Sequence, residues 1–198
     1  MYNSNITVGE LIEDLKSEVD VAIEIPDKTY VSWLNSLEQL LYSEIIKEQR
    51  AYNTLYDGNA TLPLENIADN VRFDDIHAVF VGNTQLKKST LMSGQIFLNT
   101  YYSYEDGLLG LSVKKAKPDA EMRVIYFVRP ELKTTENMAS KHVMLPIEFI
   151  DLAKAKLRGE AYKLANEDSL AAKWLNDYNV ILETFKAWIN DKSPNFGL

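Results

Sequence analysis

The sequence predicts an α+β fold, a body of four helices that carries a central antiparallel β excursion of about four strands. Two helical patterns occupy residues 1–55, two more occupy residues 143–190, and strand-like segments separated by turn residues fill residues 70–130. Apolar residues at every third or fourth position are typical of amphipathic helices, whereas β-branched and aromatic runs bounded by turn residues are typical of strands. Because neither helical pair can bury its apolar stripe alone, we expect both pairs to pack together in one domain spanning residues 1–198.

The N-terminal part of the chain contains the patterns of two helices. Thr7 and Glu10 have the spacing of a capping box, in which a hydroxyl and a carboxylate satisfy the first backbone N–H groups of a helix. The second helix is expected to begin after Pro26 and to run to about Tyr52 or Leu55. Its apolar stripe consists of Tyr30, Trp33, Leu34, Leu37, Leu40, Leu41 and Ile45. Its other face is expected to be solvated and carries the polar residues Ser32, Asn35, Glu38, Gln39 and Lys47.

The β excursion follows a loop-like stretch from Asp57 to about Asn70. Its four strand-like segments are Phe73–Val81, Gln95–Tyr102, Leu108–Val113 and Met122–Val128. Turn residues lie between them, and Arg129-Pro130 ends the last segment, because proline has no N–H to donate to a sheet. Residues 131–142 are polar and are expected to form a loop.

The C-terminal part of the chain is expected to form a helical hairpin. Pro146 suits the first turn of a helix, where a missing N–H costs nothing, and the cluster Asn166–Ser169 offers capping oxygens for a second helix. The first apolar stripe consists of Phe149, Ile150, Ala153, Leu157, Ala161 and Leu164. The second consists of Leu170, Trp174, Tyr178, Ile181, Phe185 and Trp188. We expect the two helices to be antiparallel, with Trp174, Tyr178 and Phe185 in the core.

The composition argues against several classes of protein. The 198 residues are 46% hydrophobic, enough for one good core, but no apolar run approaches the roughly 18 residues of a membrane span. The opening Met1–Asn5 has no basic region followed by an apolar one, so we expect no secretory signal. Cysteine is absent, which excludes disulfides, thiol nucleophiles and cysteine-bound zinc. The formal charge of −8, from 29 acidic and 21 basic residues, argues against nucleic-acid binding as the main activity.

No pattern for catalysis or cofactor binding is present. The eight glycines form no phosphate-binding motif, and neither His77 nor His142 has an acidic residue at ligand spacing in a helix. Asp119 with Glu131-Leu132-Lys133 resembles the pattern of metal-dependent nucleases, but an intervening strand would separate the two acids by about 40 Å. The adjacent acids Asp74-Asp75 would point to opposite faces of a strand. We therefore expect no enzyme activity, no catalytic residue, no metal and no cofactor.

Two groups of residues are candidates for binding a partner. Tyr101, Tyr102 and Tyr104 form an aromatic run; such side chains usually pack on their own sheet, but they are also typical anchors of protein–protein contacts. The tail, residues 191–198, contains proline and glycine and is expected to be flexible until it binds a partner, with Phe196 as its anchor. The candidate residues of the tail are Pro194, Phe196 and Leu198.

Short motifs follow one another in a fixed order along nearly the whole chain. They are Thr7–Ile12, Trp33-Leu34-Asn35, Gly110–Val113, Lys117-Pro118, Tyr126–Pro130, Leu145-Pro146 and Trp174–Tyr178. With the order of helices and strands, these motifs resemble the head-to-tail adaptor (connector) proteins of tailed bacteriophages. That family often has a leucine-proline at the start of its first strand. Here Leu62-Pro63 comes earlier, and Phe73-Asp74-Asp75 occupies that place.

The resemblance implies a non-enzymatic structural protein of the virion neck, assembled in the host cytoplasm. Such a protein forms a homo-oligomeric ring, here expected to have twelve copies, which docks on the portal protein and offers a platform to the tail or a further neck protein. DNA passes through the lumen without specific binding, and no membrane is involved. An acidic chain suits this role, because carboxylates repel the phosphates of passing DNA. The tail of residues 191–198 is then expected to order against the portal.

Three other interpretations remain open at this level. The chain could be another phage neck or tail component, such as a completion or tail-terminator protein. It could be a bacterial interaction module that binds another protein through the tyrosine-rich sheet. It could also be an enzyme whose chemistry leaves no known pattern.

Overall fold

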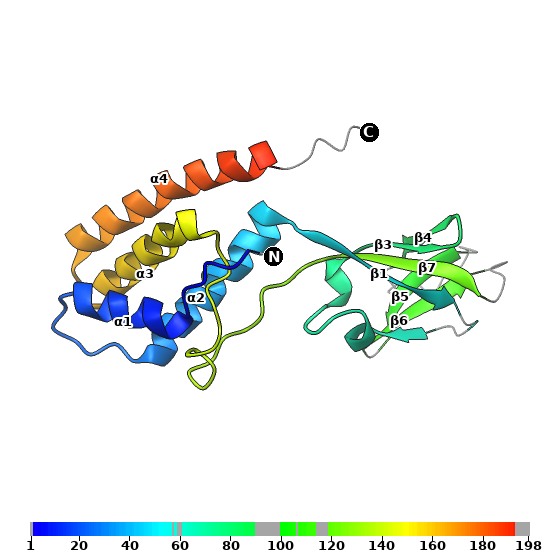
Figure 1. The fold of residues 1–198 in the computed structure, drawn as a ribbon, viewed down its shortest axis with the longest axis horizontal. Coiled ribbons are helices and arrows are strands. Elements are labelled where there is room, and N and C mark those ends of the chain that lie inside the picture. Colours follow the sequence, from blue (N-terminus) through cyan, green and yellow to red (C-terminus); the bar gives the residue numbers. More distant parts are fainter. Residues whose placement is uncertain are drawn as a thin grey trace. The chain divides into compact units, whose positions relative to one another are not determined.

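The computed structural model describes residues 2–56, 58, 61–89, 100–105, 107–113 and 119–192. The fold is α+β, as predicted, but the chain that we expected to be one domain divides into two compact units. The helical unit comprises Met1–Ile46 and Pro130–Leu198, and the β unit comprises Lys47–Arg129 (Figure 1). The chain therefore leaves the helical unit once, builds the β unit, and returns.

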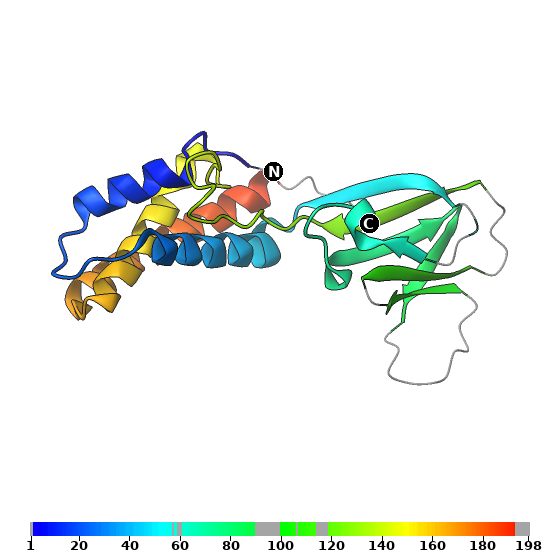
Figure 2. The same ribbon diagram turned by 90° about the horizontal axis from the view of Figure 1, so that it is seen from below.

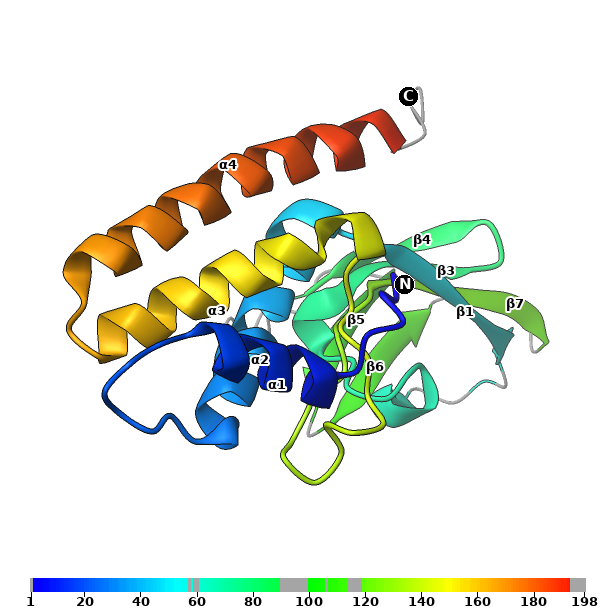
Figure 3. The ribbon, with the colours of Figure 1, turned by 60° about the vertical axis from the view of Figure 1, so that its left-hand side comes forward.

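The helical unit contains four α-helices in its described part. They are α1 (Val8–Glu18), α2 (Asp27–Leu41), α3 (Ile150–Leu164) and α4 (Asp168–Lys192). Helix α3 lies between α4 on one side and α1 and α2 on the other (Figure 3). The expected capping box of α1 is confirmed, since the Thr7 hydroxyl accepts the Glu10 N–H at 3.2 Å and the Glu10 carboxylate accepts the Thr7 N–H at 2.8 Å. Two N-terminal and two C-terminal helices thus share one core, as their unpaired stripes required.

Helix α2 is shorter than its sequence pattern suggests. It was expected to reach Tyr52 or Leu55, but it ends at Leu41 and is followed by a single π-helical turn, η1 (Tyr42–Ile46). Lys47 then has a positive φ of 47°, which no helix tolerates, and the next residues form strand β1 instead. Pairing with a strand about 70 residues away has overridden the local helical pattern.

The C-terminal hairpin forms as predicted, after a short 3₁₀ turn η4 (Ile147–Phe149). Phe185 is fully buried, and its ring centroid lies 5.0 Å from that of Phe149 in an edge-on contact. Tyr178 is also buried, in agreement with the prediction. Trp174 is only half-buried, and the Arg158 guanidinium lies 4.5 Å from its ring centroid.

Gly159 of α3 permits the close approach of α4. A Cβ at this position would lie 2.7 Å from Leu175 Cδ2, 2.8 Å from Leu175 Cγ and 3.3 Å from the Leu175 backbone nitrogen. Two of these distances are shorter than real Cβ contacts, so even alanine would force the two helices apart or bend the Leu175 side chain. The absence of a side chain at Gly159 therefore sets the spacing of the hairpin.

The β unit is one curled sheet of seven described strands, rather than about four (Figure 2). The strands are β1 (Gln49–Tyr56), β2 (Thr61–Pro63), β3 (Ile76–Val81), β4 (Thr84–Lys88), β5 (Thr100–Glu105), β6 (Leu108–Val113) and β7 (Ala120–Phe127). Their order across the sheet is β1-β7-β3-β4-β5-β6-β2. The excursion was expected to be antiparallel throughout, but β4 and β5 run parallel. Most of the expected strand Gln95–Tyr102 lies outside the described residues, and β5 covers its end.

The β unit buries apolar side chains of its own. They are Leu64, Ile67, Ile76, Ala78, Val79, Val81, Leu86, Tyr102, Leu109, Leu111, Met122, Val124 and Tyr126. The two units also differ in charge. Ten acidic and ten basic residues fall within Lys47–Arg129, so the formal charge of −8 belongs entirely to the helical unit. Within the described residues, no helix combines the length and the apolar character needed to cross a membrane.

Candidate functional site

The residues weighed for chemistry do not converge in the structure. Asp119 precedes β7 and Glu131 follows it, so the two acids of the nuclease-like pattern flank opposite ends of one strand. His77 is exposed on β3, with its ring 5.3 Å from that of Phe127. His142 is half-buried and forms an isolated backbone bridge with Thr7. Among the residues that the structure describes, no group of three or more histidines and acids is placed to hold a metal ion.

The candidate tyrosines of β5 occupy different environments. Tyr102 is 2% exposed and packs edge-on against Phe73, with 5.8 Å between ring centroids, and burial raises the pKa of its phenol. Tyr104 is 51% exposed, although its ring also lies 5.7 Å from Phe73. Tyr102 is therefore a core residue in this structure, and Tyr104 is the one whose side chain could meet a partner.

The other predicted binding residues cannot be placed. The backbone of Tyr101 pairs with Ser112 of β6, but its side chain lies outside the described part of the structure. Pro194, Phe196 and Leu198 also lie outside the described residues.

Tyr104 borders an open groove of about 750 Å³ on the β unit. Its lining combines apolar and aromatic side chains with a few charged ones. The lining residues are Pro63, Leu64, Glu65, Val71, Arg72, Phe73, Asp74, Tyr104, Gly107 and Leu108. Pro63 pairs with Leu108 across the β2–β6 ladder, and the Leu64 N–H donates to the Gly107 carbonyl at 3.1 Å. Backbone pairing therefore holds these four lining residues together.

Phe73 reaches the groove because a short turn holds it there. Residues Phe73–Asp75 were expected to begin a strand, but they form a 3₁₀ turn, η3, and β3 begins only at Ile76. The buried Asp75 carboxylate accepts the Arg72 N–H at 2.8 Å and the Arg129 Nε–H at 2.6 Å. These charge-assisted bonds close the turn, because the extended alternative would leave Asp75 buried without donors.

The rim of the groove carries charged side chains. Lys88 Nζ lies 4.5 Å from the Phe73 ring centroid and 3.4 Å from the Asp74 carboxylate, whose side chain is 89% exposed. An apolar floor with aromatic walls and a polar rim is the usual composition of a site that receives a side chain or short segment of another protein. The groove is therefore a candidate docking surface.

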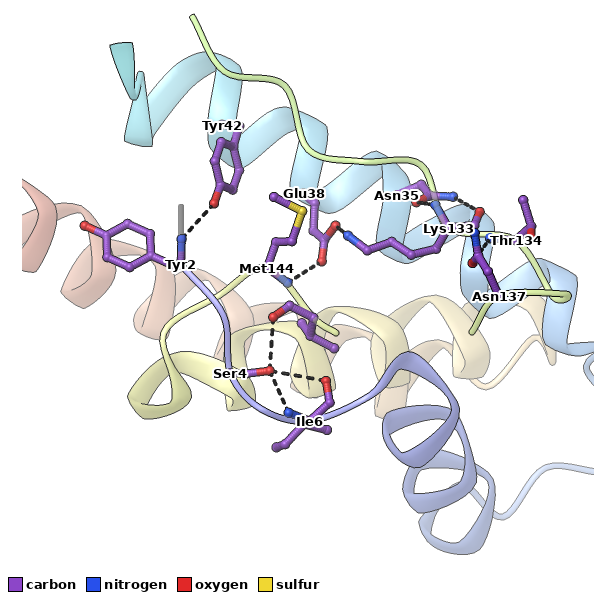
Figure 4. A network of polar contacts seen from close by, with 11 residues as sticks. Tyr2, Ser4, Ile6, Asn35, Glu38, Tyr42, Lys133, Thr134, Asn137 and Met144 are labelled. Carbon is purple, nitrogen blue, oxygen red and sulfur yellow. Dashed lines mark hydrogen bonds and ion pairs between the residues drawn. The ribbon is translucent and has the colours of Figure 1, made fainter. Parts of the chain in front are cut away.

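A second unusual site, in the helical unit, is polar and buried. The Lys133 ammonium forms an ion pair with Glu38 of α2, and both side chains are almost fully buried (Figure 4). The second Glu38 oxygen accepts the Met144 N–H at 2.8 Å. Asn35 accepts the Lys133 N–H at 2.9 Å and donates to the Lys133 carbonyl at 2.8 Å. One face of α2 thus binds the segment that leads back from the β unit.

This network corrects the prediction that Asn35 and Glu38 face solvent. Burial raises the pKa of Glu38, and the Lys133 ammonium and the Met144 N–H oppose that rise. Burial lowers the pKa of Lys133, and Glu38 opposes that change. Because each charge is matched and hydrogen-bonded, we interpret the pair as a structural clamp on residues 131–145.

Sequence reasoning identified Tyr104 but missed its neighbours. Phe73 and Pro63 were noticed only as motif positions, and no spacing along the chain links them to Tyr104. The adjacent Asp74-Asp75 was the available signal, since paired acids after an aromatic residue suit a turn as well as a strand.

No protein-family model matches the chain, and no curated protein matches its sequence.

Proposed function

We propose that this chain is a non-enzymatic structural protein of a phage virion, a head-to-tail adaptor in the neck between head and tail. In this proposal the protein forms a homo-oligomeric ring of twelve copies that docks on the portal protein and receives the tail or a further neck protein. The proposal rests on the ordered motifs and on one structural observation. Both ends of the chain build the helical unit, and the β unit is a single insertion between α2 and α3. That order of elements is the one the resemblance implies.

The charge distribution is compatible with a DNA channel. The helical unit carries the whole formal charge of −8, and the exposed acids of α1 and its following loop include Glu13, Asp20 and Glu24. Carboxylates repel DNA phosphates, so a wall of this charge would let DNA pass without holding it.

The groove beside Tyr104 is the surface that we assign to docking of a neighbouring virion protein. Tyr104 and Phe73 offer rigid aromatic contact area to a partner. The charged lining residues Glu65, Arg72 and Asp74 would orient the partner more than they would raise its affinity. Anchoring aromatic residues of this kind commonly carry more than about 1 kcal/mol of binding free energy, and about 1.4 kcal/mol corresponds to a tenfold change in Kd.

The test is imaging of the purified protein mixed with the cognate portal protein. We expect rings of the protein seated on portal particles in negative stain, and weaker occupancy, by about tenfold in Kd, for Tyr104→Ala. Val180→Ala is the control, because Val180 is an exposed apolar side chain, at 61% against 51% for Tyr104, but lies on α4. Absence of any binding to the portal would overturn the proposal.

One alternative is favoured by the same groove, a bacterial interaction module that binds another protein through the tyrosine-bearing sheet. It predicts that Tyr104→Ala abolishes binding to a host protein and that the wild-type chain does not bind the portal protein. Genes for portal, terminase and capsid beside this one would favour the adaptor instead.

A further inference from the structure

Strand β1 is an outer edge of the sheet. Among the described residues it pairs only with β7, over eight residues and without a break in register from Gln49–Phe127 to Tyr56–Ala120. The side chains of Ala51, Asn53 and Leu55 are exposed, and Leu55 reaches 60%. An edge of this length presents a row of backbone donors and acceptors to its surroundings.

The direction of these groups follows from one hydrogen bond. The Val128 N–H donates to the Glu48 carbonyl at 2.8 Å, so Glu48 and Val128 form a hydrogen-bonded pair of the antiparallel ladder. Hydrogen-bonded and non-hydrogen-bonded pairs alternate along an antiparallel ladder. The backbone N–H and C=O groups of Arg50, Tyr52, Thr54 and Tyr56 therefore point toward β7. The N–H and C=O groups of Gln49, Ala51, Asn53 and Leu55 consequently point away from it. No residue in the described part of the chain hydrogen-bonds to them.

The two edges of the sheet are protected to different degrees. Strand β2, at the opposite edge, has three residues and ends in Pro63, and short length and proline are common ways of blocking an edge. Strand β1 is neither short nor interrupted by proline. It contains no proline, no bulge against β7, and a single charged residue, Arg50, near its start. It is the edge that remains competent to accept another strand.

We infer that β1 pairs with β1 of a second copy of this chain, antiparallel and about a two-fold axis through Asn53. Outward-pointing residues must face one another, so the register places Asn53 opposite Asn53 and Ala51 opposite Leu55. On the other face Tyr52 meets Thr54, and Arg50 meets Tyr56. The contact forms about six backbone hydrogen bonds.

The side chains favour a second copy as the occupant. In this register the only charge of the strand, Arg50, meets an aromatic ring rather than another arginine, so no like charges oppose each other. Leu55, which is the most exposed large apolar side chain among the described residues of the β unit, gains the apolar partner Ala51. A contact made by one pair of eight-residue strands should bury less than a standard interface of about 1,600 Å², so we expect a weak dimer, with Kd on the order of 10–100 μM.

The inference rests on the sheet and is separate from the adaptor function. A two-fold contact closes with two copies, whereas a ring needs head-to-tail contacts. Ring formation on a portal can therefore succeed or fail independently of this pairing.

Amide hydrogen exchange of the purified protein at about 5 μM and about 1 mM tests the direction of pairing. The higher concentration is expected to slow exchange at least tenfold at the outward amides of Ala51, Asn53 and Leu55. The amides of Tyr52 and Thr54, already bonded to β7, are expected to change much less. A chain that stays monomeric at 1 mM by sedimentation, or a dimer without this alternation, would overturn the inference.

Charge substitutions at Asn53 test the register. Asn53→Lys and Asn53→Asp each place like charges opposite one another and should weaken the dimer at least tenfold. An equimolar mixture of the two variants should restore dimers to at least the wild-type level, because Lys then faces Asp. Asn53→Thr, which keeps the N–H and adds no charge, serves as the folding-matched control. Failure of the mixture to restore dimers would exclude this register.

Discussion

The helical unit and the β unit differ in where their polar groups are used. In the helical unit the Glu38–Lys133 pair is buried and holds chain segments together. In the β unit, Tyr104 is exposed beside an open groove, and the outward backbone groups of β1 have no partner in the part of the chain that the structure describes. Both candidate surfaces for a protein partner, the groove beside Tyr104 and the edge of β1, therefore lie on the β unit. Substitutions in the two units should therefore have different consequences.

The largest effect is expected from Lys133→Ala. This change leaves the Glu38 carboxylate buried without its counter-charge, which should lower the free energy of unfolding by about 3–5 kcal/mol. Urea denaturation followed by circular dichroism measures the loss. Lys156→Ala is the control, because its ion pair with Glu160 is half-exposed and should contribute less than about 1 kcal/mol. The double variant Lys133→Met with Glu38→Met should recover much of the stability. If it does not, the interpretation that the pair only holds residues 131–145 against α2 is wrong.

The next prediction contrasts two tyrosines two residues apart in β5. Tyr102→Ala removes a buried ring and should destabilise the protein by about 3–5 kcal/mol. Tyr104→Ala removes a half-exposed ring and should cost less than about 1 kcal/mol, while it weakens partner binding. Thermal unfolding of both variants checks the first part, and portal binding checks the second. Equal losses of stability would show that Tyr104 is also a packing residue.

The smallest effect is expected from glycine substitutions in two helices. Gly159→Ala should destabilise by about 1–3 kcal/mol, because the added Cβ meets Leu175 at 2.7 Å. Gly9→Ala is the matched control. Its Cβ would find its nearest neighbour, the Met138 carbonyl oxygen, at 3.6 Å, so the usual helix preference for alanine should stabilise α1 by about 0.5–1 kcal/mol. Denaturant midpoints distinguish the two, and a neutral Gly159→Ala would mean that the hairpin has room to move.

Much of the helical unit could be predicted from sequence. The capping box of Thr7 and Glu10 and the two stripes of the C-terminal hairpin are local signals, since capping and a 3.6-residue period depend on neighbours within a turn or two. The sheet was harder to predict from the sequence. Seven short strands include one parallel pair, and β2, with three residues, is too short to carry an alternating pattern.

The candidate site was predicted only in part, for a related reason. Tyr104 could be named because tyrosines are common anchors of protein contacts, but the sequence offered Tyr102 on the same ground. Phe73 contacts both rings, and only the folded structure shows that Tyr102 is buried, at 2% exposed, whereas Tyr104 is 51% exposed. The orientation of Phe73 depends in turn on Asp75 and Arg129, which are 54 residues apart.

The sequence by itself determined the fold class, the number and order of the main helices, the core positions Tyr178 and Phe185, and the acidic balance. These follow from composition and from contacts between residues close along the chain. The tertiary structure alone decided where α2 ends, that Glu38 is buried, and which edge of the sheet stays open. Lys133 meets Glu38 across 95 residues, and Met144 meets it across 106. Burial of a charge and pairing of a strand both depend on a partner that only the folded chain brings within reach.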